Sequence, residues 1–314
     1  MTRPIRKDLQ EIPPDPRGSA VTIGNFDGVH RGHARIMETL QTESTHPKTR
    51  SVVITFDPHP LRVLKPDLDL KEITPLSEKA RLLFRSGIDE IIALTFTREF
   101  AAQTAEEFFR LLLRPPLSLK TLVVGYDFHF GHHKSGHFDL IASLGKTHGV
   151  SVHMVPPFEI GGHPVSSRRI RELLRQGQVG EANALLGHNY LLLGHLTSGR
   201  GRGKTLGFPT ANLDLAFPTL LPAGVYAVRA EFEHQHAPGV MALGPRPTFE
   251  DHEHSVEIHL LDIPHNPSLK TGETFRVEVR DWLRENRKFP GPEALIQQIK
   301  QDIEKARGIL QEKR

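Results

Sequence analysis

The sequence predicts an α/β fold, in which a doubly wound parallel sheet is followed by a small antiparallel β-barrel with a C-terminal helix. The first half alternates short β-branched runs with helical patterns. After Gly187, strand-like runs follow one another between Gly/Pro-rich turns until one final amphipathic segment. With 314 residues, 38% of them hydrophobic and 25% charged, the chain is long enough for two packed domains.

The first half contains five runs that are typical of buried parallel strands, because β-branched and aliphatic residues dominate them. They are Ala20–Gly24, Ser51–Phe56, Glu90–Phe96, Thr121–Gly125 and Val150–Val155. Helical patterns lie between and after them, at His33–Thr42, Ser77–Ser86, Thr104–Leu113, Phe138–His148, Ser167–Gln176 and Val179–Leu186. In such a sheet, ligands are expected at the carboxyl ends of the strands.

The second half contains five further strand-like runs that predict the barrel. They are Tyr190–Leu196, Val225–Phe232, Gly239–Leu243, Ser255–Leu261 and Thr274–Arg280, and a helix is expected from about Pro292 to Gln311. No Ser/Gly-rich linker separates the halves, so we expect domains at residues 1–187 and 188–314.

Composition excludes several classes of site and favours a cytoplasmic protein. Cys is absent, which removes disulfides, thiolate metal sites and cysteine nucleophiles. No run of about 18 apolar residues predicts a membrane span, and the charged, Pro-rich start does not resemble a signal peptide. The net charge is +3 and the pI is about 9.1, but Lys and Arg are scattered, so we expect neither a nucleic-acid nor a membrane partner. The sequence predicts no oligomeric state.

The segment Gly24–His33, GNFDGVHRGH, follows the first predicted strand and opens a helix. Unpaired backbone N–H groups at such a junction bind anions, Gly28 and Gly32 allow close approach, and His30 and His33 add donors. A zinc pair formed by the two histidines, or ordinary turn glycines, are the alternatives. Asp27 fits a helix cap or turn residue as well as it fits the site.

The segment Gly194–Asn212 carries a second glycine-rich motif, GHLTSGRGRGKTLGFPTAN. Its stretch 198–205 nearly matches a P-loop, but Ser198 replaces the first glycine and Pro209 lies where the helix should follow, so we reject that interpretation. The Thr210 hydroxyl and the Asn212 amide oxygen are hard donors that suit Mg²⁺. Glu257 lies on the polar side of a strand pattern, where a solvated residue is equally compatible.

These motifs resemble those of bacterial bifunctional riboflavin kinase/FAD synthetases, from about residue 18 to residue 305. The HxGH element is similar to that of the α/β-phosphodiesterase superfamily of nucleotidylyltransferases, and the longer form here is more specific. Six further segments agree with the family: FDPHP at 56–60, GYDFHFG at 125–131, VSSRRIR at 165–171, LPAGVYA at 221–227, GPRPTF at 244–249 and VEIHLLD at 256–262.

For the first half, the resemblance implies a Rossmann-like nucleotidylyltransferase domain that adenylylates FMN with ATP and releases pyrophosphate. The implied catalytic residues are His30, His33 and Arg171. The implied ATP and phosphate contacts are Gly24, Asn25, Phe26, Asp27, Gly28, Gly32, Ser166 and Ser167. The implied flavin contacts are Asp57, Pro58, His59, Pro60, Asp127, Phe128 and Phe130.

For the second half, the resemblance implies a riboflavin kinase that uses Mg²⁺ and ATP. Glu257 is the implied catalytic base and Arg284 an implied flavin contact, for which a solvated loop residue is an equal alternative. The implied ATP contacts are Gly199, Gly201, Gly203, Lys204, Gly207, Pro209, Thr210 and Asn212, the last two also holding the metal. The implied partners are the small molecules riboflavin, FMN and ATP.

Three positions depart from the family pattern. Arg168 replaces the usual Thr, Lys204 the usual Arg and Ala242 the usual Asn. Two alternatives therefore stay open: a flavin-binding or regulatory homologue that has lost one activity, and a nucleotidylyltransferase for another phosphate ester. The His-rich loop 129–137 could bind a metal adventitiously, although such loops are more often solvated.

Overall fold

The computed structural model describes residues 3–45, 48–132, 135–198, 206–233, 235–245, 254–263 and 270–311. By its contacts the chain divides into two compact units, Met1–Ser166 and Ser167–Arg314, and each is described by itself. The predicted domain boundary after residue 187 stays a prediction. In the division by contacts, the helices α7 (Ser167–Arg175) and α8 (Val179–Leu186) belong to the second unit.

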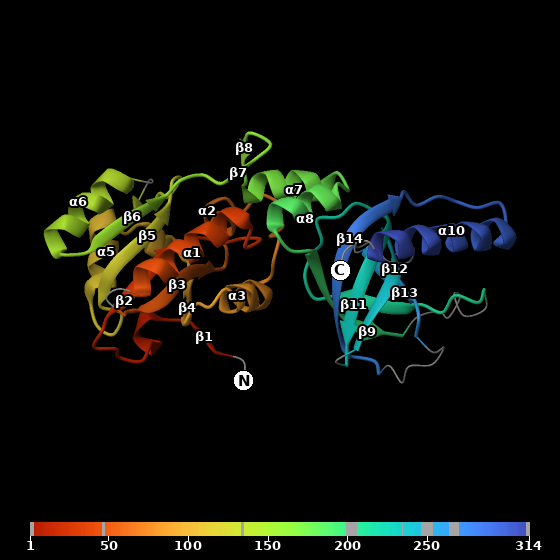
Figure 1. Ribbon diagram of the computed structural model, residues 1–314, viewed down its shortest axis with the longest axis horizontal. Helices are drawn as coiled ribbons and strands as arrows, with labels where there is room; N and C mark the ends of the chain where they lie inside the picture. Colours follow the sequence, from red (N-terminus) through yellow and green to blue (C-terminus); the bar gives the residue numbers. More distant parts are fainter. Residues whose placement is uncertain are drawn as a thin grey trace. The chain divides into compact units, whose positions relative to one another are not determined.

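The first unit contains a six-stranded sheet in the order β1-β4-β3-β2-β5-β6. Its five strand pairs are parallel, as predicted (Figure 1). The strands are β1 (Ile5–Arg6), β2 (Ser19–Ile23), β3 (Arg50–Asp57), β4 (Glu90–Thr95), β5 (Leu119–Gly125) and β6 (Ser151–Val155). A separate small hairpin joins β7 (Glu159–Ile160) to β8 (His163–Pro164).

Helices pack on both faces of this sheet, because successive strand residues point to opposite sides. Val53 of β3 lies in one buried cluster with residues of α1 (Arg31–Thr45) and α3 (Leu76–Arg85). Its neighbours Val52 and Ile54 lie in the other cluster, with residues of α5 (Ala105–Leu113) and α6 (Phe138–His148). The doubly wound arrangement is therefore confirmed. The unit also contains the short helices η1 (Leu9–Glu11), α2 (Pro60–Leu64) and α4 (Arg98–Ala101).

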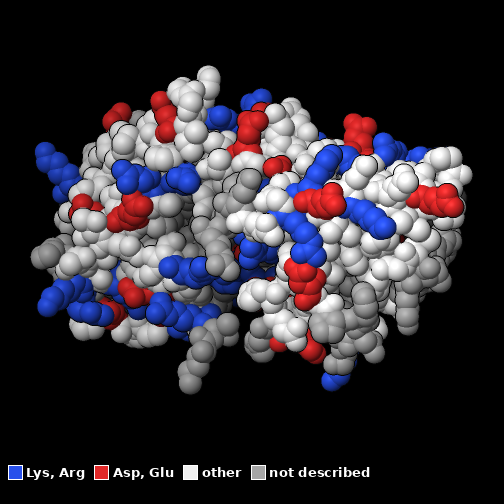
Figure 2. All heavy atoms as spheres, turned by 45° about the vertical axis from the view of Figure 1, so that its right-hand side comes forward, with Lys and Arg blue, Asp and Glu red and all other residues white. Residues whose placement is uncertain are grey.

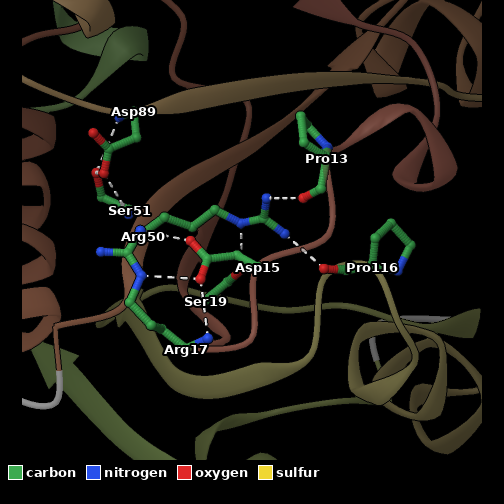
Figure 3. A network of polar contacts seen from close by, with 8 residues as sticks. All are labelled: Pro13, Asp15, Arg17, Ser19, Arg50, Ser51, Asp89 and Pro116. Carbon is green, nitrogen blue, oxygen red and sulfur yellow. Dashed lines mark hydrogen bonds and ion pairs between the residues drawn. The ribbon is translucent and has the colours of Figure 1, made fainter.

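A polar network joins the N-terminal segment to the amino ends of the strands (Figure 3). Arg50, which is buried, donates to Ser19 Oγ at 2.9 Å, to the Pro116 carbonyl at 2.6 Å and to the Pro13 carbonyl. These contacts satisfy main-chain carbonyls that no strand pairs. These contacts hold the N-terminal segment against the amino ends of the strands, and ligands of such sheets bind at the opposite, carboxyl ends.

The second unit contains a closed antiparallel barrel in the order β10-β13-β12-β11-β14-β9. Its strands are β9 (Tyr190–Thr197), β10 (Ala211–Leu215), β11 (Gly224–Phe232), β12 (Gln235–Pro245), β13 (His254–Leu260) and β14 (Thr274–Arg284). The predicted C-terminal helix is α10 (Pro292–Gln311), and its Ala306 and Leu310 pack on Val225, Ala227 and Val240 outside the barrel (Figure 1). The barrel and its helix are confirmed, with β10 as a strand that the sequence did not predict.

Charged side chains of both signs lie interspersed over the face that Figure 2 shows. Within the described residues, no helix combines the length and the apolar character needed to cross a membrane.

Candidate functional site

The loop from Gly24 to His33 joins β2 to α1 at the carboxyl edge of the sheet. Two residues in it have left-handed backbone conformations that side chains disfavour: Phe26 has φ of 47° and Val29 has φ of 39°. Such residues cost about 1–3 kcal/mol each and persist only where the surroundings hold them. Here both side chains are buried, so packing holds the strained loop.

Asp27 anchors this loop to a segment distant in the sequence. Its carboxylate, 1% exposed, accepts from the backbone N–H of Ile73 at 2.9 Å and of Thr74 at 3.2 Å. The neighbouring Gly28 N–H donates to Thr74 Oγ1 at 3.1 Å. Of the two interpretations that the sequence left open for Asp27, the geometry favours a loop-holding residue.

His30 and His33 cap the start of α1 reciprocally. The N–H of His33 donates to Nδ1 of His30, and the N–H of His30 donates to Nδ1 of His33, both at 3.3 Å. This is the arrangement of a capping box, with two imidazoles in place of Ser and Glu. The rings are stacked with centroids 3.6 Å apart at 15°. Because each Nδ1 accepts, each neutral ring carries its hydrogen on Nε2, which makes Nε2 a donor.

The protonation of His33 follows from its surroundings. Burial lowers the pKa of His33 well below its ordinary value, and a proton on the stacked His30 ring and the charge of Lys79 on α3 act in the same direction. His33 is therefore neutral near pH 7. It can stabilise a developing negative charge as an N–H donor, as the sequence suggested, without carrying a charge of its own.

The predicted flavin contacts lie at the same carboxyl edge, since they follow β3 and β5. His59 caps α2, its Nδ1 accepting from the N–H of Leu61 at 3.1 Å, and Pro60 is the first residue of that helix. Asp57 pairs with Lys7 at 3.1 Å. After β5, Phe130 is buried in the core of the first unit, and Phe128 packs against that core.

An aromatic cluster connects these two strand ends. Phe128 and Phe130 are stacked with ring centroids 5.3 Å apart, and Phe130 contacts Phe108 of α5 at 6.1 Å. Further edge-on or tilted contacts then lead back to β3 through Phe100, Phe96 and Phe56. Sequence reasoning missed this cluster. The spacing of Phe96 and Phe100 was its only local signal.

Ser166 ends the first unit, whereas Ser167 and Arg171 lie on α7 in the second. Arg168, where the family commonly has Thr, extends into solvent with a side chain 89% exposed. It pairs with Glu172 one turn later at 3.0 Å. The departure from the family pattern therefore adds a surface ion pair on α7.

In the barrel, strand register brings three predicted kinase residues together. Asn212 of β10 lies directly opposite Glu257 of β13 and opposite Thr197 of β9. Thr210, just before β10, donates from Oγ1 to Glu257 Oε2 at 3.4 Å. Directly opposite residues project from the same face of a sheet. A hydroxyl, an amide oxygen and a carboxylate, all hard oxygen groups, thus share one face, a donor set that fits Mg²⁺.

Four of the remaining predicted ATP contacts lie outside the part of the chain that the structure describes: Gly199, Gly201, Gly203 and Lys204. Gly207 has φ of 86°, a conformation that glycine adopts readily. Ala242, the departure on β12, lies directly opposite Glu257 and leaves that side of the carboxylate without a polar side chain from this position.

Arg284 of β14 binds a carboxylate of α10. Its guanidinium makes three hydrogen bonds of 2.8–3.0 Å to the carboxylate of Asp302, which is 2% exposed. Gln298 donates to the same carboxylate at 2.8 Å. The arrangement fastens the helix to the barrel, so any flavin contact by Arg284 would be an additional role.

Among the described residues, no three His, Asp or Glu side chains converge in a way that could hold a metal ion. His133 of the His-rich loop lies outside those residues. The described histidines of that loop are His129, whose Nδ1 lies 2.8 Å from the Asp127 carbonyl, His132 and His137.

Comparison with known proteins gives two family matches, one in each half. A family model described as FAD synthetase matches residues 12–169, and one described as riboflavin kinase matches residues 186–310. The chain is 36% identical to the bifunctional riboflavin kinase/FMN adenylyltransferase of Escherichia coli (strain K12), over 94% of this chain and 93% of that protein. It is 33% identical to the Bacillus subtilis (strain 168) protein of the same name, over 92% and 91% respectively.

A solved structure also matches the whole chain. The crystal structure of a protein from Streptococcus pneumoniae, described as a macrolide-efflux protein, gives a TM-score of 0.86 at 32% identity. The match covers 98% of this chain and 99% of that one.

Proposed function

This chain belongs to the family of bifunctional riboflavin kinase/FMN adenylyltransferases, and from that premise we propose how its residues carry out the two reactions. It phosphorylates riboflavin to FMN and adenylylates FMN to FAD. The observation that carries this conclusion is the presence of two motif sets in one chain, each within the range of its own family model. The two family matches favour neither of the alternatives that the sequence left open.

In the adenylylation, a phosphate oxygen of FMN attacks the α-phosphorus of ATP, and the bond to the bridging oxygen breaks to release pyrophosphate. The negative charge that develops there needs fixed donors. The Nε2–H groups of His30 and His33 supply them. We propose that Ser166, Ser167 and Arg171 contact the outgoing pyrophosphate. The reciprocal caps support this role because they fix both rings before substrate binds.

In the kinase reaction, Glu257 accepts the proton of the riboflavin 5′-hydroxyl while that oxygen attacks the γ-phosphorus of ATP and ADP leaves. Thr210 and Asn212 would hold Mg²⁺ beside this carboxylate. When bound, the ion would neutralise charge on the phosphates. The strand register that places Asn212 opposite Glu257 supports this assignment.

The remaining assignments are proposals of the same kind. We place the flavin of the adenylylation site against Asp57–Pro60 and against Asp127, Phe128 and Phe130. The cluster of phenylalanines behind Phe130 supports that position, since an isoalloxazine ring binds to aromatic and apolar surfaces. We further propose that the enzyme acts in the cytoplasm on riboflavin, FMN and ATP, without a nucleic-acid or membrane partner.

The test is to incubate the pure protein with riboflavin, ATP and Mg²⁺ and to separate FMN from FAD by chromatography. We expect both products. Glu257→Ala should abolish FMN formation while FAD still forms from supplied FMN. The matched control is Glu231→Ala, which removes an exposed carboxylate from β11 and should leave both activities intact. Loss of both activities in a folded Glu257→Ala protein would contradict the assignment.

A further inference from the structure

His259 of β13 makes a side-chain contact that the two reactions above do not use. Its Nδ1 lies 2.9 Å from the carbonyl oxygen of Pro209, and its ring meets Phe208 edge-on, with centroids 5.6 Å apart at 82°. A carbonyl oxygen only accepts, so Nδ1 carries the hydrogen and donates. The bond forms whether the imidazole is neutral or charged.

This hydrogen bond lies where the ladder between β10 and β13 ends. The paired residues run from Leu213 opposite Val256 to Ala211 opposite Ile258. Beyond Ala211 the chain reaches Thr210 and Pro209, and proline has no N–H to donate to a neighbouring strand. The imidazole of His259 therefore ties the chain to β13 beyond the last backbone pair.

The same strand thereby holds Thr210 from two sides. Glu257 Oε2 accepts from Thr210 Oγ1 at 3.4 Å, and His259 binds the carbonyl of the peptide that joins Pro209 to Thr210. Fixing that peptide restricts the backbone at Thr210. The direction of its hydroxyl relative to Glu257 then depends on His259.

We propose that His259 is a positioning residue of the kinase site, which fixes the Pro209–Thr210 peptide so that Thr210 and Asn212 present their oxygens to Mg·ATP. This inference rests on the proposed kinase site at Thr210, Asn212 and Glu257. His259 touches no reacting atom in it. It acts on the site through the main chain at Pro209 and Thr210.

Three variants of the full-length enzyme separate the hydrogen bond from the packing of the ring. His259→Asn keeps an N–H donor near the position of Nδ1 and loses the ring. His259→Gln carries the same amide one bond farther out, near the position of Nε2. His259→Phe keeps a ring against Phe208 and loses the donor. The measurements are kcat and the KM for Mg·ATP and for riboflavin in FMN formation, with adenylylation of supplied FMN as the internal control.

We expect His259→Phe and His259→Gln to raise the KM for Mg·ATP about fivefold to tenfold, the scale for losing one hydrogen bond. The KM for riboflavin and the adenylylation rate should stay within about twofold of wild type, and His259→Asn should restore the KM for Mg·ATP. Because Gln and Phe both remove the bond, either folded variant suffices. An unchanged KM for Mg·ATP in that variant, or an Asn variant as impaired as Gln, would overturn the proposal.

Thr210→Ala, measured in parallel, distinguishes a wrong placement of the kinase site from a wrong role for His259. If Thr210→Ala keeps full FMN formation, the placement of the kinase site is wrong, and the inference about His259 fails with it. If Thr210→Ala is inactive while His259→Phe and His259→Gln behave as wild type, only the role of His259 is refuted.

Discussion

Replacing Asp27 tests whether this carboxylate holds the loop between β2 and α1 in place or acts on substrate. Asp27→Ala leaves the buried N–H groups of Ile73 and Thr74 without their acceptor, at about 1–3 kcal/mol each, so the free energy of unfolding should fall by about 2–6 kcal/mol. For a domain of this size that lowers its Tm by roughly 5–20 °C. In Asp27→Asn, Oδ1 still accepts both donors, whereas the charge and the 3.1 Å contact of Oδ2 are lost. We expect about 1–2 kcal/mol there.

The assay compares Tm with the rate of FAD formation from FMN, at a temperature where every variant is folded. If Asp27 is an anchor, activity should follow stability, with Asn a few-fold below wild type and Ala more than tenfold below it. Riboflavin phosphorylation should not change. Asp89→Ala, which removes a carboxylate bound to the backbone N–H of Ser51 at the amino edge, is the control and should leave FAD formation intact. Equal inactivity of both Asp27 variants at wild-type Tm would refute the anchor and assign the carboxylate to the reaction.

Three further predictions concern the two sites and acid stability. His30→Ala or His33→Ala should slow FAD formation by roughly 10²-fold or more, which is the scale for losing one preorganised donor, while the rate of FMN formation stays within a few-fold of wild type. Wild-type rates of FAD formation in both variants would refute the role of the histidines as donors. Lys204→Arg should preserve or improve steady-state FMN production at saturating ATP, because we expect an auxiliary charge there; a dead variant beside an active Thr210→Ala would contradict the placement of the site. Hydrogen bonds from the side chain and backbone of Arg17 lower the pKa of Asp15 from 3.8 to about 2. The pair therefore stabilises the fold at pH values above the pKa that Asp15 has in the unfolded chain, and this contribution is lost as the pH falls through about 2. Thermal melts should therefore show a smaller fall in Tm between pH 4 and pH 2 for Asp15→Asn than for wild type, and equal falls would exclude the effect.

Most elements of the fold could be predicted because their local patterns are strong. Parallel strands buried on both faces consist of apolar runs, and the helices between them have clear limits, such as the capping box formed by Thr104 and Glu107 at the start of α5. Strand β10 was missed because it begins two residues after Pro209, inside a glycine-rich motif that resembles a loop. Its pairing with β9 and β13 comes from barrel closure, which no local pattern contains. Strand β1 is too short, at two residues, to have a period.

The candidate site could be predicted as a set of residue types, but the contacts that hold it could not. The anchor of Asp27 lies 46 residues away in the sequence at Ile73, in a segment without a motif. The reciprocal caps of His30 and His33 depend on imidazole orientations that only the folded loop defines. Likewise, no local pattern indicates that the guanidinium of Arg284 binds Asp302 on α10, and the flavin contact expected of Arg284 stays a prediction.

The charge of the loop between β2 and α1 depends on the ionisation of Asp27 and His33. A carboxylate beside a polyphosphate would repel it, yet Asp27 lies within the loop. Its charge is 1% exposed and faces the N–H groups of Ile73 and Thr74, so these donors offset it before substrate arrives. His33 stays neutral because burial opposes its protonation, as do a proton on His30 and the charge of Lys79. In the adenylylation site that we propose, the attraction for phosphate comes from the oriented Nε2–H groups of His30 and His33, and these favour the transition state because they need not reorient when charge develops.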